Sequence, residues 1–276
     1  MEIISSRNNP KIKEARILKN AKYRRQSGLC LVEGIWHFIE AVEAWRQGGY
    51  ATLIHVFYSP DLLTSELARK IIQEVETAGI PCYAVTADVF SSMAEKEHPQ
   101  GVLAVVRPKV VKLDQLEADK HDWLVGLVEP QDPGNIGSIM RTMDAVGAKG
   151  LLLIDRGAEA FHPEAIRASM GAGFWMPVIQ TSFEEMIHWA AMNDYRIYGT
   201  SAHGTREVGA IHFYQKPCIL LMGSERQGLS QPQRAACHEL IRLPMVGRVS
   251  SLNLAVATGI MLYDMLAKMD SAHGSI

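Results

Sequence analysis

Short runs of apolar residues alternate with amphipathic stretches along the whole chain. In the second half, LLLID at 151–155 and CILLMG at 218–223 are almost wholly apolar, and a helical pattern at 135–146 precedes the first of them. A strand that is apolar on both faces needs a covering layer on each side, and strands that alternate with helices form parallel sheets. The pattern therefore predicts an α/β fold whose second half contains a mostly parallel sheet.

Length and one polar segment divide this α/β chain into two domains. A chain of 276 residues, 47% of them apolar, suits two domains of ordinary size. Residues 108–121, PKVVKLDQLEADKH, are mostly polar and begin with proline, which is typical of a linker. We therefore expect a smaller domain at 1–107, a linker at 108–121 and a second domain at 122–276.

Composition excludes several classes of protein. No opening segment has the pattern of an export signal, and the apolar tract at 252–266 is interrupted by polar residues and shorter than the roughly 20 residues of a membrane span. The four cysteines have no CxxC spacing, and the ten histidines include no HExxH motif. We therefore expect a cytoplasmic protein with reduced thiols, no membrane segment and no bound metal.

The glycine-rich segment GSERQG at 223–228 resembles a phosphate-binding loop but lacks its decisive residue. That loop needs a lysine after its last glycine; here Leu229 occupies the place, and Glu225 would repel phosphate. GTSAHG at 199–204 has one residue too many for a nucleophile elbow, and GAGFW at 171–175 lacks the third glycine of a dinucleotide fingerprint. A phosphotransferase, a serine hydrolase and an ordinary Rossmann enzyme are therefore disfavoured.

Charge is unevenly distributed, although the net charge is only −2. Residues 1–30 carry eight basic side chains against two acidic ones, and Asn9-Pro10 before apolar residues at helical spacing predicts a helix with its cations turned outward. Such a basic arm suits the phosphate backbone of a nucleic acid, while a solvated helix face explains it equally well. The candidates in the arm for contacts with a nucleic acid are Lys11, Lys13, Arg24 and Arg25.

Three loops that directly follow apolar strands carry polar residues beyond what a connection requires. They are EPQDPGNIGSIMRT at 129–142, GSERQG at 223–228 and LPMVGRVSSLN at 243–253. Because ligands of open α/β sheets bind at the carboxyl ends of the strands, we expect the three loops to meet at one site. Taken singly, Asn135 and Ser251 would be ordinary helix caps.

Together the three loops resemble, in the same order, the sequence motifs of the SpoU (TrmH-like) RNA ribose 2′-O-methyltransferases, over most of residues 123–268. Residues 1–107 resemble, more loosely, the ribosomal-protein-like α/β substrate-binding domain that often precedes them. The resemblance implies a SPOUT-type trefoil-knotted α/β methyltransferase domain, a homodimer, and S-adenosylmethionine as methyl donor. Two positions depart from the usual motifs, with Leu254 in place of valine and Arg226 in place of glycine.

The same resemblance assigns roles to individual residues. The residues implied for the cofactor are Thr200, Gly223, Leu243, Met245 and Leu252. The residues implied around the reacting hydroxyl are Arg141, Asn135, Glu225, Ser251 and Asn253. Since a guanidinium stays protonated at neutral pH, we expect Arg141 to hold an RNA phosphate and stabilise the developing alkoxide rather than to act as the base.

The implied reaction is methyl transfer from S-adenosylmethionine to a ribose 2′-hydroxyl of RNA. The appended N-terminal domain favours ribosomal RNA as the substrate. Transfer RNA is the alternative substrate. A second alternative, from another class, is an RNA-binding or assembly factor that has the same fold and no activity. Every polar residue of the motifs is present, so the enzyme is favoured.

Overall fold

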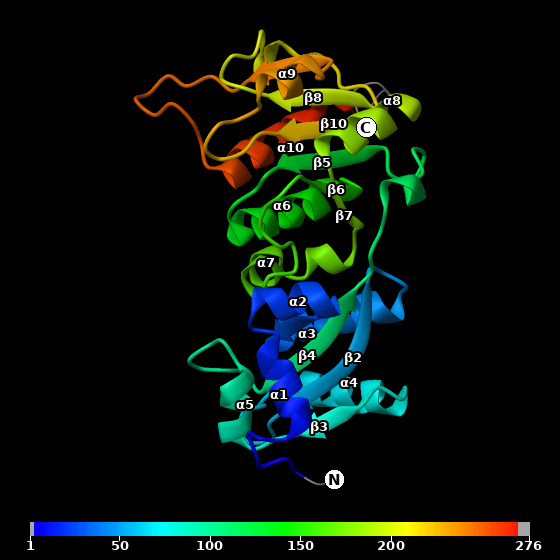
Figure 1. Cartoon of the computed structure of the whole chain (residues 1–276), viewed down its shortest axis with the longest axis vertical. Helices are drawn as coiled ribbons and strands as arrows, with labels where there is room; N and C mark the ends of the chain where they lie inside the picture. Colours follow the sequence, from blue (N-terminus) through cyan, green and yellow to red (C-terminus); the bar gives the residue numbers. More distant parts are fainter. Residues whose placement is uncertain (1–2, 270–276) are drawn as a thin grey trace. The chain divides into compact units, whose positions relative to one another are not determined.

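The computed structural model describes residues 3–269 and separates into two compact units (Figure 1). The first unit comprises the residues up to Lys109 together with Phe161–Trp175, and the second comprises Val110–Ala160 together with the chain from Met176 onward. The expected second domain, 122–276, therefore contains a segment that packs with the first unit, which nothing in the apolar pattern indicates. In the described part of the chain, no helix has the length and apolar character needed to cross a membrane.

A four-stranded sheet forms the centre of the first unit, in the order β1-β4-β2-β3. β4 runs antiparallel to β1 and β2, whereas β2 and β3 are parallel. Each strand coincides with a mostly buried apolar run of the chain. Their bounds are β1 Cys30–Glu33, β2 Ala51–Tyr58, β3 Cys82–Ala84 and β4 Val102–Pro108.

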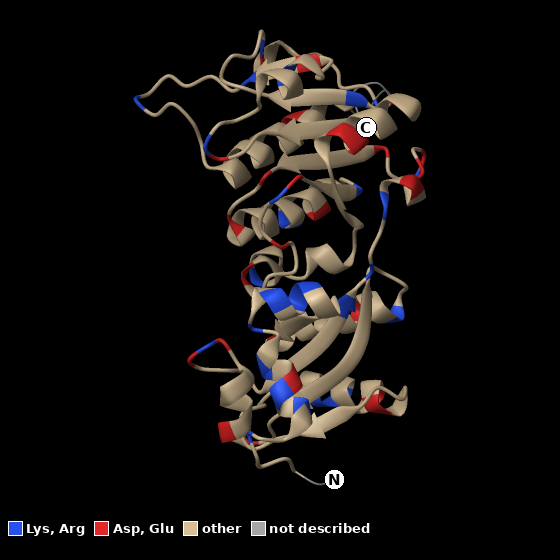
Figure 2. Ribbon diagram, in the orientation of Figure 1, with Lys and Arg blue, Asp and Glu red and all other residues tan. Residues whose placement is uncertain are grey.

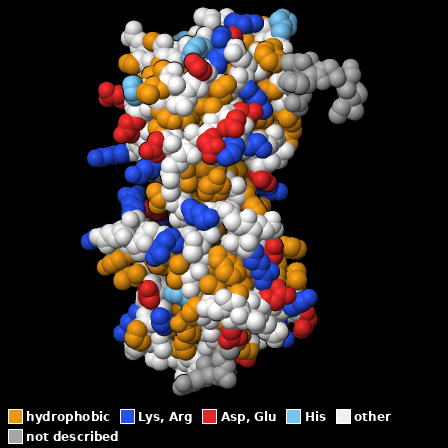
Figure 3. Space-filling view, turned by 90° about the vertical axis from the view of Figure 1, so that its right-hand side faces the viewer, with side chains coloured by type: hydrophobic (Ala, Val, Ile, Leu, Met, Phe, Trp, Pro, Cys, Tyr) orange, Lys and Arg blue, Asp and Glu red, His pale blue; other side chains and the backbone are white. Residues whose placement is uncertain are grey.

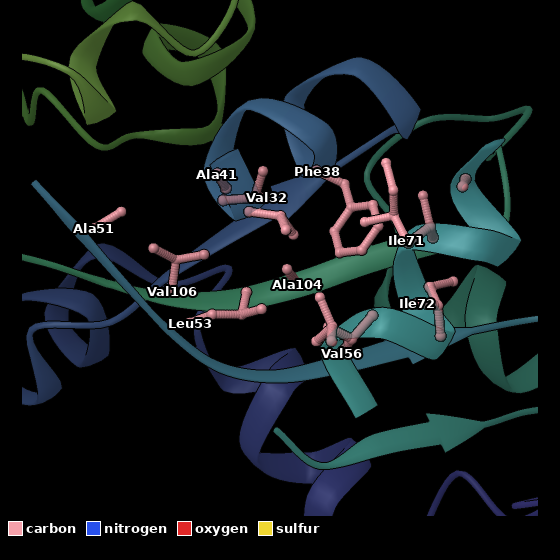
Figure 4. Close-up of a cluster of buried hydrophobic side chains, with 14 of the residues drawn as sticks. Val32, Phe38, Ala41, Ala51, Leu53, Val56, Ile71, Ile72, Ala104 and Val106 are labelled. Atoms are coloured by element: carbon pink, nitrogen blue, oxygen red, sulfur yellow. The ribbon is translucent and has the colours of Figure 1, made fainter. Parts of the chain in front are cut away.

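Helices cover both faces of this sheet. On one face, Phe38 of α3 and Ile71 of α4 pack with Val56 and Val106 of the sheet (Figure 4). On the other face, a second apolar cluster joins α1 and α5 to the strands. The helices of this unit are α1 Pro10–Ile17, α2 Ala21–Ser27, α3 Ile35–Arg46, α4 Glu66–Thr77, α5 Ala87–Met93, α7 Pro163–Ser169 and the 3-10 turn η2 Ala172–Phe174.

The basic arm forms two short helices rather than a single one. Asn9 caps α1 through its side chain, as the sequence predicts, and Ile12 of α1 is buried. The chain then turns at residues 18–20, and the side chain of Asn20 caps α2. Asparagine at a helix start competes with a continuous helix, because its carboxamide satisfies the free amides of a new first turn.

Arg24 corrects one prediction for this arm. Its side chain is 5% exposed and does not face outward. The guanidinium donates to the backbone carbonyls of Leu18, at 3.0 Å, and Lys19, at 2.8 Å, so it stabilises the turn between the two helices. The carbonyl groups left over at the end of α1 need donors, and a buried guanidinium supplies them. In Figure 2 both helices of the arm are partly blue, the colour of lysine and arginine. The other three candidates are exposed: Lys11, Lys13 and Arg25.

The second unit contains a seven-stranded sheet in the order β7-β6-β5-β10-β8-β11-β9. Every neighbouring pair is parallel, which confirms the sheet predicted for this half. β10 lies between β5 and β8, although it follows both in the sequence. The bounds are β5 Trp123–Val128, β6 Gly150–Ile154, β7 Val178–Thr181, β8 Arg196–Thr200, β9 Arg206–Glu207, β10 Cys218–Met222 and β11 Glu239–Arg242.

Two of the helices in this unit, α6 and α10, pack against each other. α6 begins at Pro133, two residues before the predicted start, because the side chain of Asp132 accepts from the amide of Gly134 at 2.7 Å. It ends as predicted at Gly147, which has a φ of 78°. The helices and 3-10 turns are η1 Leu113–Gln115, α6 Pro133–Val146, α8 Phe183–Met192, η3 Val208–Ala210, α9 Gln231–Ala235 and α10 Leu254–Met269.

Most of the segment interpreted as a linker packs onto the second unit. Leu116 is 5% exposed and lies in an apolar cluster with Leu124 of β5 and Met186 of α8. Val111 and Leu113 pack against the same cluster. The few apolar side chains of this polar segment therefore extend the core of the second unit.

Acidic and basic side chains are interspersed on the surface, as Figure 3 shows for one face. Several of them form exposed ion pairs, among them Arg46 with Glu74 and Arg242 with Glu207. Exposed pairs contribute little to stability because water screens them. The apolar clusters on the two sheets are therefore the main source of stability.

Candidate functional site

Loops at the carboxyl ends of three neighbouring strands line an open cavity of about 1060 Å³ in the second unit. Its wall includes residues 200–203 after β8, 222–229 after β10, and 241–246 and 250–254 after β11. The strands β10, β8 and β11 are parallel neighbours, so their carboxyl ends meet at one edge of the sheet. The second and third of the three polar loops of the sequence therefore share this site.

All the residues that the resemblance implies for the cofactor line this cavity. Thr200 ends β8, and its hydroxyl donates to the sulfur of Met222 at 3.4 Å. The others come from the loops after β10 and β11. The set is Thr200, Gly223, Leu243, Met245 and Leu252.

The loop after β10 is a tight turn that requires its glycines. A Cβ on Gly223 would collide with the backbone of Gly228 and Leu229. Gly228 has a φ of 65°, in the left-handed region, and its amide donates to the carbonyl of Ser224 at 2.9 Å. The turn folds back on itself and presents residues 224–227 to the cavity. This geometry explains the two glycines without any phosphate.

A chain of hydrogen bonds connects the first loop to the other two. Nδ2 of Asn253 donates to Oδ1 of Asn135 at 2.9 Å, and Nδ2 of Asn135 donates to Oε1 of Glu225 at 3.4 Å. The amide of Gln131 donates to both carboxylate oxygens of Glu225 at 3.2 Å. Asn135 is 8% exposed and therefore depends on these partners for its hydrogen bonds. The three loops thus form one site, in which Asn135 contacts two side chains of the cavity wall.

Ser251 and Arg141 stand outside this chain of hydrogen bonds. Ser251 is exposed and lines the cavity. Arg141 is exposed on α6. Because it comes six residues after Asn135 in the helix, the two side chains point to different sides of the helix. Arg141 lies outside the cavity wall, and its guanidinium forms no hydrogen bond or ion pair with any residue between 3 and 269. The structure therefore brings together all the implied site residues except Arg141.

Several residues of the cavity wall were not predicted from the sequence. Ser201 and His203 follow β8 directly, and Glu207 and Arg242 add an ion pair of 2.6 Å between their side chains. The available signal was the segment RIYGTSA at 196–202, because residues just after a strand lie at the same sheet edge as the three loops. Within the described ranges, no group of three or more His, Cys, Asp and Glu side chains is arranged to hold a metal ion.

Comparison with known families decides what kind of protein this is. The model of the SpoU rRNA methylase family matches residues 122–263, and that of the MRM3-like substrate binding domain matches residues 9–104. The chain belongs to the SpoU rRNA methylase family. This membership confirms the resemblance seen in the three loops and the α/β fold class expected from it.

Relatives within the SpoU family match nearly the whole chain. The 23S rRNA (uridine(2479)-2′-O)-methyltransferase of Streptomyces viridochromogenes is 35% identical over 270 residues, which cover 95% of this chain and 90% of that protein. The 23S rRNA (guanosine(2553)-2′-O)-methyltransferase RlmP of Bacillus subtilis is 29% identical and covers 95% of this chain and 98% of its own.

Solved structures agree with these relatives. The AdoMet-bound rRNA methyltransferase from Sinorhizobium meliloti has a TM-score of 0.86 at 28% identity, covering 99% of both chains. The SpoU methyltransferase AviRb from Streptomyces viridochromogenes, in complex with the cofactor AdoMet, has a TM-score of 0.83 at 30% identity, covering 96% of this chain and all of that one. Both similarities extend across the N-terminal and the SpoU parts of the chain.

Proposed function

We propose that this protein transfers a methyl group from S-adenosylmethionine to a ribose 2′-hydroxyl of ribosomal RNA. The observation that carries the proposal is the cavity lined by the second and third motif loops, to which the first loop is joined through Asn253, Asn135 and Glu225. The names of the relatives favour ribosomal RNA over transfer RNA. All four cysteines are free thiols, which suits the cytoplasm, where we place the reaction.

The cavity fits S-adenosylmethionine in size and lining. Its volume of about 1060 Å³ lies at the upper end of sites for ligands of this size. Met245 and Leu252 offer apolar surface to a purine, and the backbone of the loops can pair with a ribose and an amino-acid group. When bound, the cofactor supplies an activated methyl group on a sulfonium. The residues proposed to hold it are Thr200, Gly223, Leu243, Met245 and Leu252.

The residues around the cavity have different proposed roles in the reaction. Glu225, held by Asn135 and the Gln131 amide, has a fixed orientation, so its charge is preorganised beside the cavity. Asn253 and Ser251 provide neutral polar groups in the wall near the approaching 2′-hydroxyl. The exposed guanidinium of Arg141 is free to hold an RNA phosphate in two hydrogen bonds and to stabilise the developing alkoxide.

A homodimer is part of the proposal. Val256, Ile260 and Tyr263 of α10 are 51%, 43% and 56% exposed and recur at a spacing of three or four residues. They form an apolar stripe along one side of a helix whose opposite side, with Thr258, Met261 and Met265, is buried. A second copy of the chain that covers this stripe would remove apolar surface from water.

Cofactor binding is the direct test of the proposed function. Isothermal titration calorimetry with S-adenosylmethionine should give one site for each chain, and S-adenosylhomocysteine should compete for it. Tritiated cofactor and unmodified ribosomal RNA should then give labelled RNA, with the label in a 2′-O-methyl nucleoside by mass spectrometry. No binding at millimolar cofactor would favour the inactive RNA-binding factor, and labelling of transfer RNA alone would change the substrate.

Arg141→Ala separates catalysis from cofactor binding. Because Arg141 lies outside the cavity wall, the dissociation constant for S-adenosylmethionine should stay that of the wild type. Turnover should fall by roughly 100-fold or more, the usual effect of removing a group that stabilises developing charge. Weakened cofactor binding in this variant would contradict the assignment.

A further inference from the structure

Arg234 is a residue of the cavity wall to which neither the three motifs nor the proposed reaction assigns a role. It lies in α9, the short helix after the β10 loop, and its side chain lines the cavity. The start of this helix is held in place because the amide of Ser230 donates to Oε1 of Gln233 at 2.8 Å. Arg234 therefore contributes a cation to the wall from an element outside the three loops.

The guanidinium of Arg234 is anchored to the backbone of the chain. Its Nη1 donates to the carbonyl of Leu229 at 2.6 Å, in a partly buried contact. This bond uses one of the five N–H groups of the side chain, and no other side-chain hydrogen bond joins Arg234 to a residue between 3 and 269. The anchor limits where the guanidinium can lie, and Nε and Nη2 are left available to a ligand.

No carboxylate of the described chain neutralises the charge of Arg234, which is half-buried. The two glutamates of the cavity wall have other partners. Glu207 pairs with Arg242 at 2.6 Å, and Glu225 accepts from the first of the three loops. A cation that has lost part of its water is costly without a counter-charge, and an anion that pairs with it removes that cost.

The other two arginines of the wall differ from Arg234 in their surroundings. Arg242 is paired with Glu207, and Arg226 is exposed in the turn after β10. Among the arginines that line this cavity, Arg234 is therefore the one that is both half-buried and unpaired. An RNA phosphate, which belongs to a bulky chain, reaches an exposed guanidinium more readily than a half-buried one, so a small anionic group suits Arg234 better.

The charges of S-adenosylmethionine indicate which of its groups suits this arginine. At neutral pH the cofactor has two cationic groups, the sulfonium and the ammonium, and one anionic group, the α-carboxylate. A guanidinium repels the first two and binds a carboxylate through two parallel hydrogen bonds. The two nitrogens of Arg234 that have no partner can supply such a pair of bonds.

We propose that Arg234 binds the α-carboxylate of S-adenosylmethionine and so orients the amino-acid end of the cofactor. Fixing this end restricts the rotation of the chain that carries the sulfonium, which favours one direction for the methyl group. The inference rests on the proposed function, in which S-adenosylmethionine is the methyl donor. It deepens that function by naming the residue that distinguishes the cofactor from related nucleosides without a carboxylate.

The test compares two ligands by isothermal titration calorimetry on the full-length protein. They are S-adenosylmethionine and its decarboxylated form, which keeps the sulfonium and the amine. Arg234→Gln removes the charge and keeps a donor, whereas Arg234→Lys keeps the charge and loses the forked geometry. The measured quantity is the ratio of the two dissociation constants in each variant, because damage that weakens both ligands equally cancels in it.

Arg226→Gln and Arg196→Gln are the matched controls. Arg226 is the exposed arginine of the same wall, and Arg196 is a half-buried arginine at the start of β8, away from the carboxyl ends of the strands. Thermal unfolding of every variant shows whether the fold is retained. Fluorescence anisotropy with a labelled ribosomal RNA fragment measures RNA binding in parallel.

The wild type should bind S-adenosylmethionine at least about tenfold more tightly than the decarboxylated form, as expected for a charge-assisted pair. In Arg234→Gln the two dissociation constants should differ by no more than about twofold, because the affinity for the carboxylate is lost. Arg234→Lys should keep part of the difference. Both controls should keep the wild-type ratio, and RNA binding should be unchanged in Arg234→Gln.

A wild-type ratio near one would overturn the assignment, as would the same ratio in Arg234→Gln as in the wild type. Loss of the ratio in Arg226→Gln alone would place the carboxylate at the exposed turn instead. An unchanged ratio with weaker RNA binding in Arg234→Gln would assign this arginine to a phosphate. In all these outcomes S-adenosylmethionine still binds and the proposed methyl transfer stands, whereas a wild type that binds no S-adenosylmethionine would defeat both proposals.

Discussion

Asn135 shows at the scale of one residue why the site needs a carboxamide. The side chain accepts from Asn253 through its oxygen and donates to Glu225 through its nitrogen. Of the short side chains, only an amide carries a donor and an acceptor in this forked arrangement. A carboxylate of the same shape would keep one contact and turn the other into repulsion.

Asn135→Asp tests this geometry. The new carboxylate would face Glu225, so the free energy of unfolding at pH 7 should fall by about 1 to 3 kcal/mol. Repulsion raises the folded-state pKa of the pair, and stability lost in this way returns as the pH falls and one carboxyl takes a proton. Urea unfolding at pH 7 and pH 5 measures both effects.

Ser138→Asp is the control for that comparison. Ser138 is exposed on the same helix, so the variant adds the same charge without the contact to Glu225. A loss of stability in Ser138→Asp equal to that in Asn135→Asp would show that helix charge, and not the pairing in the site, is responsible.

The loop after β10 shows how a single element is determined by close backbone approach. Its first glycine lies against the backbone of Gly228 and Leu229, where no Cβ has room. The sequence alone shows two glycines at phosphate-loop spacing, and only the folded loop shows that one serves close approach and the other a positive φ.

Gly223→Ala should therefore distort the cavity wall. We expect the affinity for S-adenosylmethionine to fall by at least about tenfold, together with a loss of about 1 to 3 kcal/mol in stability from the strained turn. Gly209→Ala is the matched control, since a Cβ there meets nothing within 4 Å. Calorimetry and thermal unfolding measure the two effects, and unchanged cofactor affinity in Gly223→Ala would contradict the role of this loop.

The apolar stripe on α10 belongs to the same scale, because it is a property of one helix face. Ile260→Lys places a charge in the centre of the stripe, and the proposed homodimer should dissociate, since an uncompensated charge in an interface is costly. Light scattering after size exclusion gives the mass. Met192→Lys, at a 72% exposed position on α8, should leave the mass of the wild type unchanged. A wild-type monomer at micromolar concentration would argue against the dimer.

At the scale of the whole molecule, the buried thiols of both units make the stability of the fold depend on pH. Burial raises the pKa of Cys30 and Cys82 to about 12 and that of Cys237 to about 11, and it also raises the pKa of Cys218. In the unfolded chain these thiols ionise near pH 8.5. A group whose folded pKa is raised contributes stability that is present below its unfolded pKa and is lost as the pH rises above it.

The free energy of unfolding should therefore fall between pH 8 and pH 10. Each fully buried thiol should lower the free energy of unfolding by roughly 2 kcal/mol at pH 10, because the thiol loses its proton only in the unfolded state. Urea unfolding at the two pH values measures the change, and Cys30→Ala should reduce it by the share of one thiol. The same pH dependence in wild type and variant would contradict this explanation.

The sequence by itself determined many of the strands and helices, the parallel sheet and the family. Alternating apolar runs fix where strands can be buried, and the three polar loops carry the motifs that identify a SpoU methylase. These features depend on residues that are close together in the chain, so their spacing is visible without coordinates. The cap at Asn9 and the helix end at Gly147 are of this kind.

Only the tertiary structure decided which distant residues meet. The insertion of β10 between β5 and β8 brings Glu225 to Asn135. The fold also buries Arg24 and leaves Arg141 outside the cavity. Residues 161–175 become part of the first unit. No local pattern encodes these outcomes. They follow from strand order and from the need to pair buried polar groups, and both depend on contacts between residues far apart in the sequence.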